Sequence, residues 1–225
     1  DKTNKKIIAD FTPSYFFDHN APKRIFNSLG EKIKFLVVLR NPVDRAYSHY
    51  LHSRRDHHEN EDFEESLKLE ANRLSKYQEN LDYLSYLRHS YVHQGLYSEM
   101  VKRYLKYFSL DNFLFINFED ELLKEKDLTI QKILDFLEID RSILLNTNIR
   151  SNPSSKERSQ TLKRIMKKTG WWRVLLKTII PSLKMRQIIK NRIQRANLRV
   201  FTPKRIMQVQ REKIYTSYFK DDIRN

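Results

Sequence analysis

The segment Ile33–Leu39 is the part of this chain that most restricts its fold. Apart from Lys34 it is apolar on both faces of an extended chain, which is typical of a central strand in a sheet covered on both sides. The next residues turn the chain, because Asn41 is a good helix N-cap and Pro42 suits the first helical position. We therefore predict a buried strand followed directly by a helix from Pro42 to about Arg55.

Strand and helix patterns alternate through the first two thirds of the chain. Further buried strands are predicted at Ile7–Phe11 and Phe113–Phe118, where short apolar runs are flanked by polar or turn residues. Further helices are predicted from apolar spacing and from end signals at 21–29, 63–79, 98–107 and 128–137. This order predicts an α/β fold, a three-layer domain with a mostly parallel central sheet.

The positive charge of the chain is concentrated in its last third. The 225 residues carry a net charge of +15, and residues 151–225 hold 20 Lys and Arg against 4 Asp and Glu, whereas residues 1–150 are nearly neutral. After Asn152-Pro153, apolar residues recur at helical spacing, and Thr202-Pro203 starts a last helix to about Phe219. We predict a core at 1–150 and a basic helical C-terminal part of the same domain at 151–225, without strands.

Composition excludes several classes of site. The chain has no cysteine, which excludes a disulfide scaffold, a zinc site with thiolate ligands and a cysteine nucleophile. No apolar run is long enough for a spanning helix, and no signal peptide is visible, so we expect a cytoplasmic protein of bacterial type. His49 and His52 have a spacing that could bridge a metal, but a solvated His-rich helix end is favoured, and no metal is predicted.

Arg40 and Ser48 are the residues whose spacing carries chemistry. Arg40 follows a buried strand, at the sheet edge where open α/β sheets bind ligands. Ser48 lies six residues beyond Pro42, about 9 Å along the helix. A guanidinium and a hydroxyl so placed could hold one phosphate near the positive end of the helix dipole. In the alternative interpretation, Arg40 pairs with Asp44 and Ser48 faces solvent.

The sequence Leu39–Tyr50 resembles the signature of sulfotransferases that use 3′-phosphoadenosine 5′-phosphosulfate (PAPS). It is most similar to the branch that contains the heparan-sulfate and bacterial carbohydrate sulfotransferases. Outer segments resemble the same family, so that the resemblance extends from about Ile7 to Ile223. These segments are Thr12–Phe16, Gly95–Tyr97, Phe118–Leu122, Ile133–Leu137 and Tyr218–Ile223.

The resemblance implies a P-loop-kinase-like domain that transfers a sulfuryl group from PAPS to a hydroxyl of a carbohydrate or another small alcohol. It implies that Arg40 and Ser48 bind the 3′-phosphate of PAPS and of its product, adenosine 3′,5′-bisphosphate. Arg158 is a further candidate for donor binding, with a solvated helix start as its alternative. Asp10 could orient the acceptor hydroxyl or cap a turn, and His93 could face the cleft, the core or the surface.

A second family segment, Lys-x-Gly-Thr-Thr, holds the 5′-phosphosulfate and is absent from this sequence. The chain has only Gly30, Gly95 and Gly170, and none of them lies in such a loop. We therefore expect a domain that is cut at both ends, whose catalytic base and 5′-loop precede Asp1. Such a chain should bind the 3′-phosphate half of the donor weakly and transfer no sulfate.

Two other classes of function remain open for the basic third. Residues 151–225 could bind nucleic acid through phosphates, although no recognition module is visible. Trp171-Trp172, among apolar and basic residues, could centre a membrane-peripheral helix, although a helix that covers the sheet or the acceptor cleft is favoured.

Overall fold

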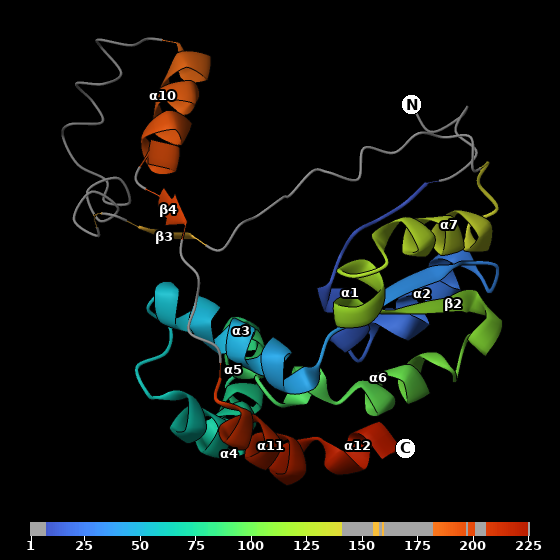
Figure 1. The fold of residues 1–225 in the computed structure, drawn as a ribbon, viewed down its shortest axis with the longest axis horizontal. Helices are drawn as coiled ribbons and strands as arrows, with labels where there is room; N and C mark the ends of the chain where they lie inside the picture. The colour runs from blue at the N-terminus through green and yellow to red at the C-terminus, as the bar shows by residue number, and fades with distance from the viewer. Residues whose placement is uncertain are drawn as a thin grey trace. The chain divides into compact units, whose positions relative to one another are not determined.

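The structure is a computed structural model (Figure 1). It describes residues 8–140, 155–157, 159, 182–196, 198–200 and 206–224. By their contacts, the residues form two units, Asp1–Thr147 together with Ile206–Asn225, and Asn148–Arg205. The last two helices of the chain therefore belong with the first unit.

The first unit contains a parallel pair of strands, β1 (Phe35–Leu39) and β2 (Phe113–Asn117). Their register pairs Phe35 with Phe113 and Leu39 with Asn117. Both predicted strands and their parallel pairing are confirmed. Because the two strands end at the same edge, the residues that follow them, Arg40 and Phe118, leave the sheet side by side.

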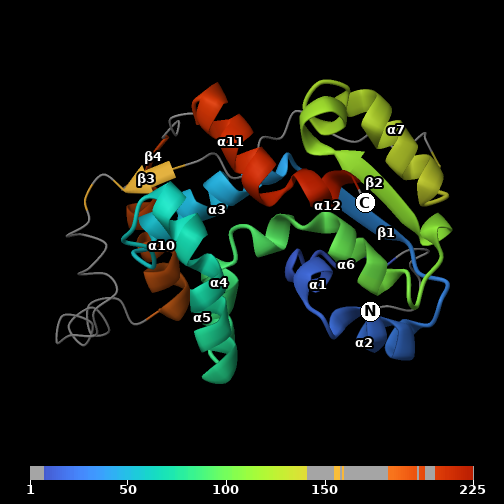
Figure 2. The ribbon, with the colours of Figure 1, turned by 90° about the horizontal axis from the view of Figure 1, so that it is seen from below.

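Helices lie on both sides of this small sheet, as Figure 2 shows, with α7 (Lys126–Phe136) on one side and α2 (Ala21–Leu29) and α6 (Tyr97–Tyr104) on the other. The face toward α6 is aromatic. Phe35 stacks on Phe113 with ring centroids 4.7 Å apart and meets Phe108 edge-on at 4.8 Å. The predicted layered α/β arrangement is thus present in the described residues.

The prediction of a strand at Ile7–Phe11 is wrong where it can be examined. Residues 8–11 form no strand, and Ile7 lies outside the described residues. Ile8 and Phe11 are 66% and 92% exposed. A short apolar run becomes a strand only when a neighbouring strand satisfies its backbone N–H and C=O groups, and in the described residues β1 pairs with β2 alone.

The burial of β1 on both faces is also only partly as predicted. Leu36 and Val38 are 42% and 49% exposed, whereas Phe35 and Val37 pack in the aromatic cluster. In the described residues, one face of β1 is covered more fully than the other.

Four longer helices match their predicted positions within two or three residues. They are α2, α4 (Phe63–Glu79), α6 and α7, and α3 (Pro42–Arg55) has the predicted bounds. The short helices α1 (Ser14–Phe17) and α5 (Tyr83–His89) were not predicted, because they are too short to show a helical period. Three single turns also lie in this unit, η1 (His93–Gly95), η2 (Leu110–Asn112) and the π-helical η3 (Phe118–Leu122).

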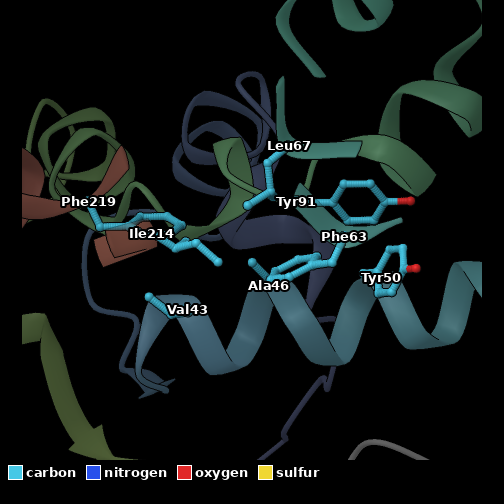
Figure 3. Packing of buried hydrophobic residues seen from close by; sticks show 8 residues of the cluster. All are labelled: Val43, Ala46, Tyr50, Phe63, Leu67, Tyr91, Ile214 and Phe219. Atoms are coloured by element: carbon cyan, nitrogen blue, oxygen red, sulfur yellow. The ribbon is translucent and has the colours of Figure 1, made fainter. Parts of the chain in front are cut away.

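The core beside α3 joins distant parts of the chain (Figure 3). Val43, Ala46 and Tyr50 form the buried stripe of α3, as their helical spacing requires. They pack with residues of α4 and with Tyr91. Ile214 and Phe219, from the far end of the sequence, complete the same cluster and are 3% and 0% exposed.

The last predicted helix therefore needs correction. Residues 201–205 lie outside the described residues, and Ile206 and Met207 are not helical. The helix α11 is Gln208–Tyr218 with Met207 as its N-cap, and α12 (Lys220–Arg224) follows it. Thr202-Pro203 is a local start signal, but the described helix begins at Gln208, directly after the extended backbone of Met207.

The second unit contains an antiparallel strand pair, β3 (Ser155–Glu157) and β4 (Leu198–Val200), and the helix α10 (Leu183–Ala196). The prediction that the tail has no strand is wrong. Each strand has three residues, too few to show alternation, and Ser155 pairs with Val200 across more than 40 residues of chain. No described helix is both long and apolar enough to cross a membrane.

Gly95 lets two elements approach closely beside the sheet edge. A Cβ at this position would lie 2.8 Å from Cε1 of Phe219 and 3.3 Å from Cβ of Pro42. We expect Gly95→Ala to lower the free energy of unfolding by about 1–3 kcal/mol, because the buried Phe219 ring must shift. Urea denaturation measures this change.

A double variant provides the control for this prediction. Phe219→Leu removes the ring that an alanine side chain would meet. The double variant Gly95→Ala with Phe219→Leu should therefore lose less free energy of unfolding than the sum of the losses of the two single variants. Additive effects would show that the clash does not determine the residue at position 95.

Candidate functional site

Arg40 lies directly after β1, and three neighbours hold it. Its carbonyl oxygen accepts a hydrogen bond from the Tyr97 hydroxyl at 3.0 Å. Its guanidinium lies over the ring of Phe118, 5.5 Å from the centroid, a cation–π contact. Its Nε donates to Glu119 Oε1 at 3.4 Å. The side chain is thus oriented from the end of β2.

The outer end of the Arg40 guanidinium is not engaged in this arrangement. The two terminal nitrogens make no hydrogen bond with any residue in the described part of the chain, and the side chain is 39% exposed. The alternative in which Arg40 pairs with Asp44 is wrong. Asp44 instead accepts from Arg211 of α11 at 2.6 Å. Two donors of a planar fork therefore remain for an anionic ligand.

Asn41 caps the helix that follows. Its side-chain oxygen accepts from the backbone N–H groups of Val43 and Asp44 at 3.1 and 3.3 Å. Its own N–H donates to Glu119 Oε2 at 3.1 Å. These first-turn amides of α3 are used by the cap, so the helix can attract an anion through its dipole, and the direct contacts must come from side chains.

Ser48 lies on α3, half-buried, and its hydroxyl makes no hydrogen bond with any described residue. It stands two residues from the buried Ala46, which places it on the opposite side of the helix from the core. It also stands one turn after Asp44, on the same side. Arg40 and Ser48 therefore both present unengaged donors beside the first two turns of α3.

The segment between α5 and α6, which ends just before Tyr97, is held from both sides by buried charge. Arg45 of α3 donates to the carbonyl oxygens of Ser90 and Tyr91 and to the Gln94 side chain at 3.2 Å. Glu70 of α4 accepts from the N–H groups of Val92 and His93 at 2.7 and 2.8 Å. Burial raises the pKa of Glu70 to about 7, although these amides and Arg45 favour its charged form.

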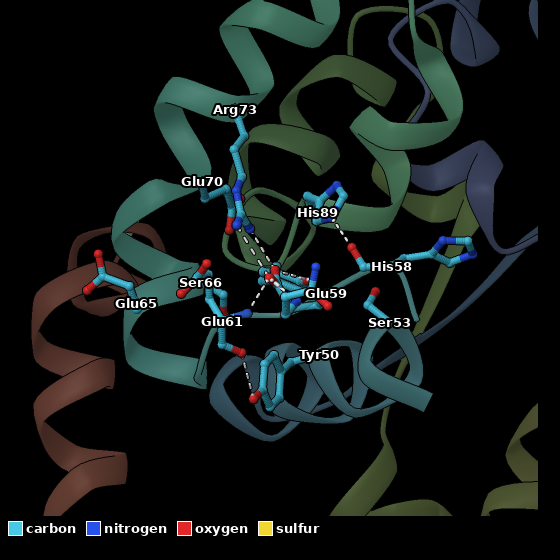
Figure 4. A network of polar contacts seen from close by, with 12 residues as sticks. Tyr50, Ser53, His58, Glu59, Glu61, Glu65, Ser66, Glu70, Arg73 and His89 are labelled. Carbon is cyan, nitrogen blue, oxygen red and sulfur yellow. Dashed lines mark hydrogen bonds and ion pairs between the residues drawn. The ribbon is translucent and has the colours of Figure 1, made fainter. Parts of the chain in front are cut away.

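A second buried carboxylate anchors the loop between α3 and α4 (Figure 4). The Glu59 side chain is 1% exposed and pairs with Arg73 of α4 at 2.6 Å. It also accepts from the Tyr91 hydroxyl at 3.0 Å and from two backbone N–H groups of the loop. Burial opposes its charge, but the bonds from Arg73, the Glu61 N–H and Tyr91 keep the pKa of Glu59 below its ordinary value.

The other residues singled out in the sequence lie in several places. Asp10 is exposed, and its carboxylate accepts from the Thr12 hydroxyl at 3.0 Å. His93 is half-buried, and its ring lies edge-on to Phe17 at 5.9 Å. Burial lowers its pKa. Arg158 and Trp171-Trp172 lie outside the described residues, and their roles stay predictions.

The two histidines of α3 have different surroundings. His49 packs edge-on against Tyr91 at 5.1 Å, and burial with the nearby Arg45 lowers its pKa to about 3. His52 is exposed. The expected solvated His-rich end is therefore correct for His52 and wrong for His49, which stays neutral inside the protein.

Sequence reasoning missed the residue that orients Arg40. Glu119 is 79 residues from Arg40 and touches both Arg40 and Asn41. Two sequence signals point to Glu119: it lies in Phe118–Leu122, a segment that resembles the family, and it comes just after the second buried strand, where parallel strands end at one edge. The structure adds that Phe118–Leu122 is a π-helical turn, and such turns are frequent at functional sites.

We expect Glu119→Gln to weaken binding of an anion at Arg40 by about threefold to tenfold, because a neutral amide holds the guanidinium and the Asn41 N–H less firmly. Isothermal titration with adenosine 3′,5′-bisphosphate measures the change. Asp120→Asn is the matched control, because it removes the same charge at the next residue, whose carboxylate pairs with the exposed Lys124. Equal effects of the two variants would contradict an orienting role.

Comparisons with known proteins agree on one family. Residues 3–179 match the family model described as "Sulfotransferase domain". The chain is 30% identical over 138 residues to heparan sulfate glucosamine 3-O-sulfotransferase 6 of Homo sapiens, covering 61% of this chain and 37% of that protein. It is 27% identical over 165 residues to carbohydrate sulfotransferase 15 of Mus musculus, covering 61% and 29%.

Solved structures give the same result. A sulfotransferase from Alicyclobacillus acidocaldarius superimposes with a TM-score of 0.53 at 31% sequence identity, covering 62% of this chain and 53% of that one. The chain spans about a third of the length of the curated relatives that it matches.

Proposed function

Because this chain belongs to the sulfotransferase domain family, we propose that it takes part in sulfuryl transfer from PAPS to a hydroxyl group, and that Arg40 and Ser48 bind the 3′-phosphate of the donor. The observation that supports this most is the state of Arg40. Its Nε and backbone are held by Glu119 and Tyr97, while its terminal nitrogens bond no residue that the structure describes.

A phosphate fits the donors present at this site. It would accept from the Arg40 fork and from the Ser48 hydroxyl, and it would lie near the positive end of the α3 dipole. Asp44 is paired with Arg211, so it does not compete for Arg40. Glu119 binds Arg40 through its Nε and would share the guanidinium with the phosphate.

The proposed reaction is an in-line displacement. The acceptor oxygen attacks the sulfur of PAPS, the bond from sulfur to the 5′-phosphate oxygen breaks, and the electron pair leaves with adenosine 3′,5′-bisphosphate. The acceptor proton passes to a general base. Arg40 and Ser48 are not at the reacting atoms. They fix the position of the donor, so that the sulfur is presented in one orientation.

A carbohydrate or another small alcohol is the proposed acceptor. The similar proteins named above include a heparan sulfate glucosamine 3-O-sulfotransferase and a carbohydrate sulfotransferase, which supports a saccharide. We further propose the P-loop-kinase-like plan for the core, with the basic helical C-terminal part at residues 151–225. Location in the cytoplasm stays a prediction from the sequence.

Residues 1–225 by themselves should bind the donor without transferring sulfate. They contain no Lys-x-Gly-Thr-Thr segment, so the 5′-phosphosulfate lacks the lysine and the loop amides that would stabilise its developing charge. An assay with radiolabelled PAPS and a panel of saccharides should give counts at the level of the protein-free blank. Turnover well above that blank would show that other residues supply this function.

The experiment that tests the site compares two nucleotides. Adenosine 3′,5′-bisphosphate should bind about tenfold or more tightly than adenosine 5′-monophosphate, which lacks the 3′-phosphate, because charge-assisted hydrogen bonds are lost with it. Isothermal titration calorimetry at fixed ionic strength measures both affinities. Equal affinity for the two nucleotides would rule out a 3′-phosphate site.

A further inference from the structure

A separate cavity lies in the first unit where the connection from α1 to α2 meets the turn from α4 to α5. Its volume is about 290 Å³. Its walls come from the end of α1, from residues 18–20, from the last turn of α4 and from α5. Neither Arg40 nor Ser48 lines it, so it is distinct from the proposed phosphate site.

Aromatic rings form much of the wall of this cavity. Phe17 and Tyr86 are buried and stack with centroids 5.8 Å apart at 26° between planes. Tyr77 and Tyr83 also line it, and Tyr83 is 52% exposed. Phe17 and Tyr86 face each other, so the exposed ring of Tyr83 is the aromatic face offered to a ligand. An aromatic face beside hydroxyl and amide groups suits a ligand with apolar C–H faces and polar edges, which is the surface of a sugar ring.

The polar side chains of the wall offer little charge with which a ligand could pair. Asp18 is the one carboxylate among the lining residues, and its oxygens already accept from the Asn20 N–H at 2.8 Å and from Arg24 at 2.7 Å. His19 has its pKa lowered by burial and by Arg103, so it is neutral at pH 7. No Lys or Arg is among the described residues that line the cavity. A sulfated or carboxylated ligand would find no cation in this wall.

The turn at the rim supports a binding role. Leu81 lines the cavity, is 90% exposed and has a φ of +55°, a backbone conformation that is unfavourable for a leucine. An exposed apolar side chain at a positive φ lowers the stability of the protein when no ligand is bound. Contact with the C–H face of a ligand would recover part of that cost.

We propose that this cavity binds an uncharged hexopyranose ring. In the reaction proposed above the ring belongs to a saccharide acceptor, at a position remote from the hydroxyl that reacts, and this second part rests on the proposed function. The cavity wall is joined to the phosphate site by one short segment. Phe17 and Tyr86 both contact the ring of His93, and Tyr97, four residues later, holds the backbone of Arg40.

The test uses neutral disaccharides without any nucleotide. Cellobiose, maltose and lactose are titrated into residues 1–225 while saturation-transfer NMR follows the sugar protons. At least one of them should bind, and Tyr83→Ala should weaken that binding about fivefold through loss of the stacked ring. Tyr83→Phe, which keeps the ring, should bind the same sugar as the parent protein does. Leu128→Ala, a change at a leucine of α7 that is 63% exposed, is the matched control and should have no effect.

Each outcome decides between the possibilities. A sulfated heparin disaccharide that binds better than the neutral sugars, or binding that is insensitive to Tyr83→Ala, would overturn the proposal, as would failure of all three sugars to bind. Titration of the same variants with adenosine 3′,5′-bisphosphate separates the two proposals. If a variant loses sugar binding and keeps nucleotide binding, the result bears on the cavity alone. If nucleotide binding fails, the result bears on Arg40 and Ser48 alone.

Discussion

Arg40→Ala should lower the affinity for adenosine 3′,5′-bisphosphate about 100-fold, the largest functional effect expected in this chain. The change removes the two terminal nitrogens, which bond no described residue, and the loss of two charge-assisted hydrogen bonds at about 1.5 kcal/mol each, the low end for such bonds, gives about this factor. The affinity of Arg40→Lys should lie between those of the parent protein and of Arg40→Ala, because an ammonium keeps the charge and loses the planar fork. Isothermal titration calorimetry at one salt concentration measures all three proteins.

Two further variants make this result specific. Ser48→Ala should lower the affinity less, about threefold to tenfold, because a neutral hydroxyl is lost. Arg55→Ala removes the same charge at the other end of α3, where Arg55 contacts Asp56, and should change the affinity less than twofold. If Arg40→Ala bound the nucleotide like the parent protein with an unchanged melting temperature, the 3′-phosphate would have to be assigned to other residues.

Arg73→Ala should cause the largest loss of stability, about 3–5 kcal/mol. It removes the charged partner of Glu59, whose side chain is 1% exposed, and leaves a buried carboxylate with only neutral donors. Urea denaturation followed by circular dichroism measures the loss. Lys124→Ala breaks an ion pair of equal length whose side chains are 71% and 62% exposed, and it should cost less than about 1 kcal/mol.

The charge of Glu59 can be tested separately. Glu59→Gln combined with Arg73→Met removes both charges while an amide oxygen can still accept from the loop, so this double variant should be more stable than Arg73→Ala. The pKa of Glu59 is lowered by folding, so its contribution is present above the ordinary carboxyl pKa of 4.5 and is lost as the pH falls through the folded value. The deficit of Arg73→Ala should therefore shrink in acid. A deficit no greater than that of Lys124→Ala would show that the pair is not important.

Local signals predicted the elements at the site. The apolar run before Arg40, the Asn41 cap and Pro42 at the first helical position led to β1 and α3 with nearly the observed bounds. These features work through backbone dihedral preferences and hydrogen bonds between near neighbours, so they can be read from a few residues. The same kind of signal predicted a strand at Ile7–Phe11, which residues 8–11 do not form, because a strand also needs a partner.

The sequence by itself therefore determined the strand–turn–helix unit, the family resemblance and the candidates Arg40 and Ser48. Only the tertiary structure decided which charges face which. Glu119 is 79 residues from Arg40 in the chain and accepts from its Nε, and Arg211 is 167 residues from Asp44 and pairs with it. The terminal nitrogens of Arg40 therefore bond no described residue and can hold a ligand. It also brought Phe17 and Tyr86 together in one wall of the aromatic cavity. Such pairings depend on how the helices and the sheet pack, and packing joins residues whose separation in the chain carries no local signal.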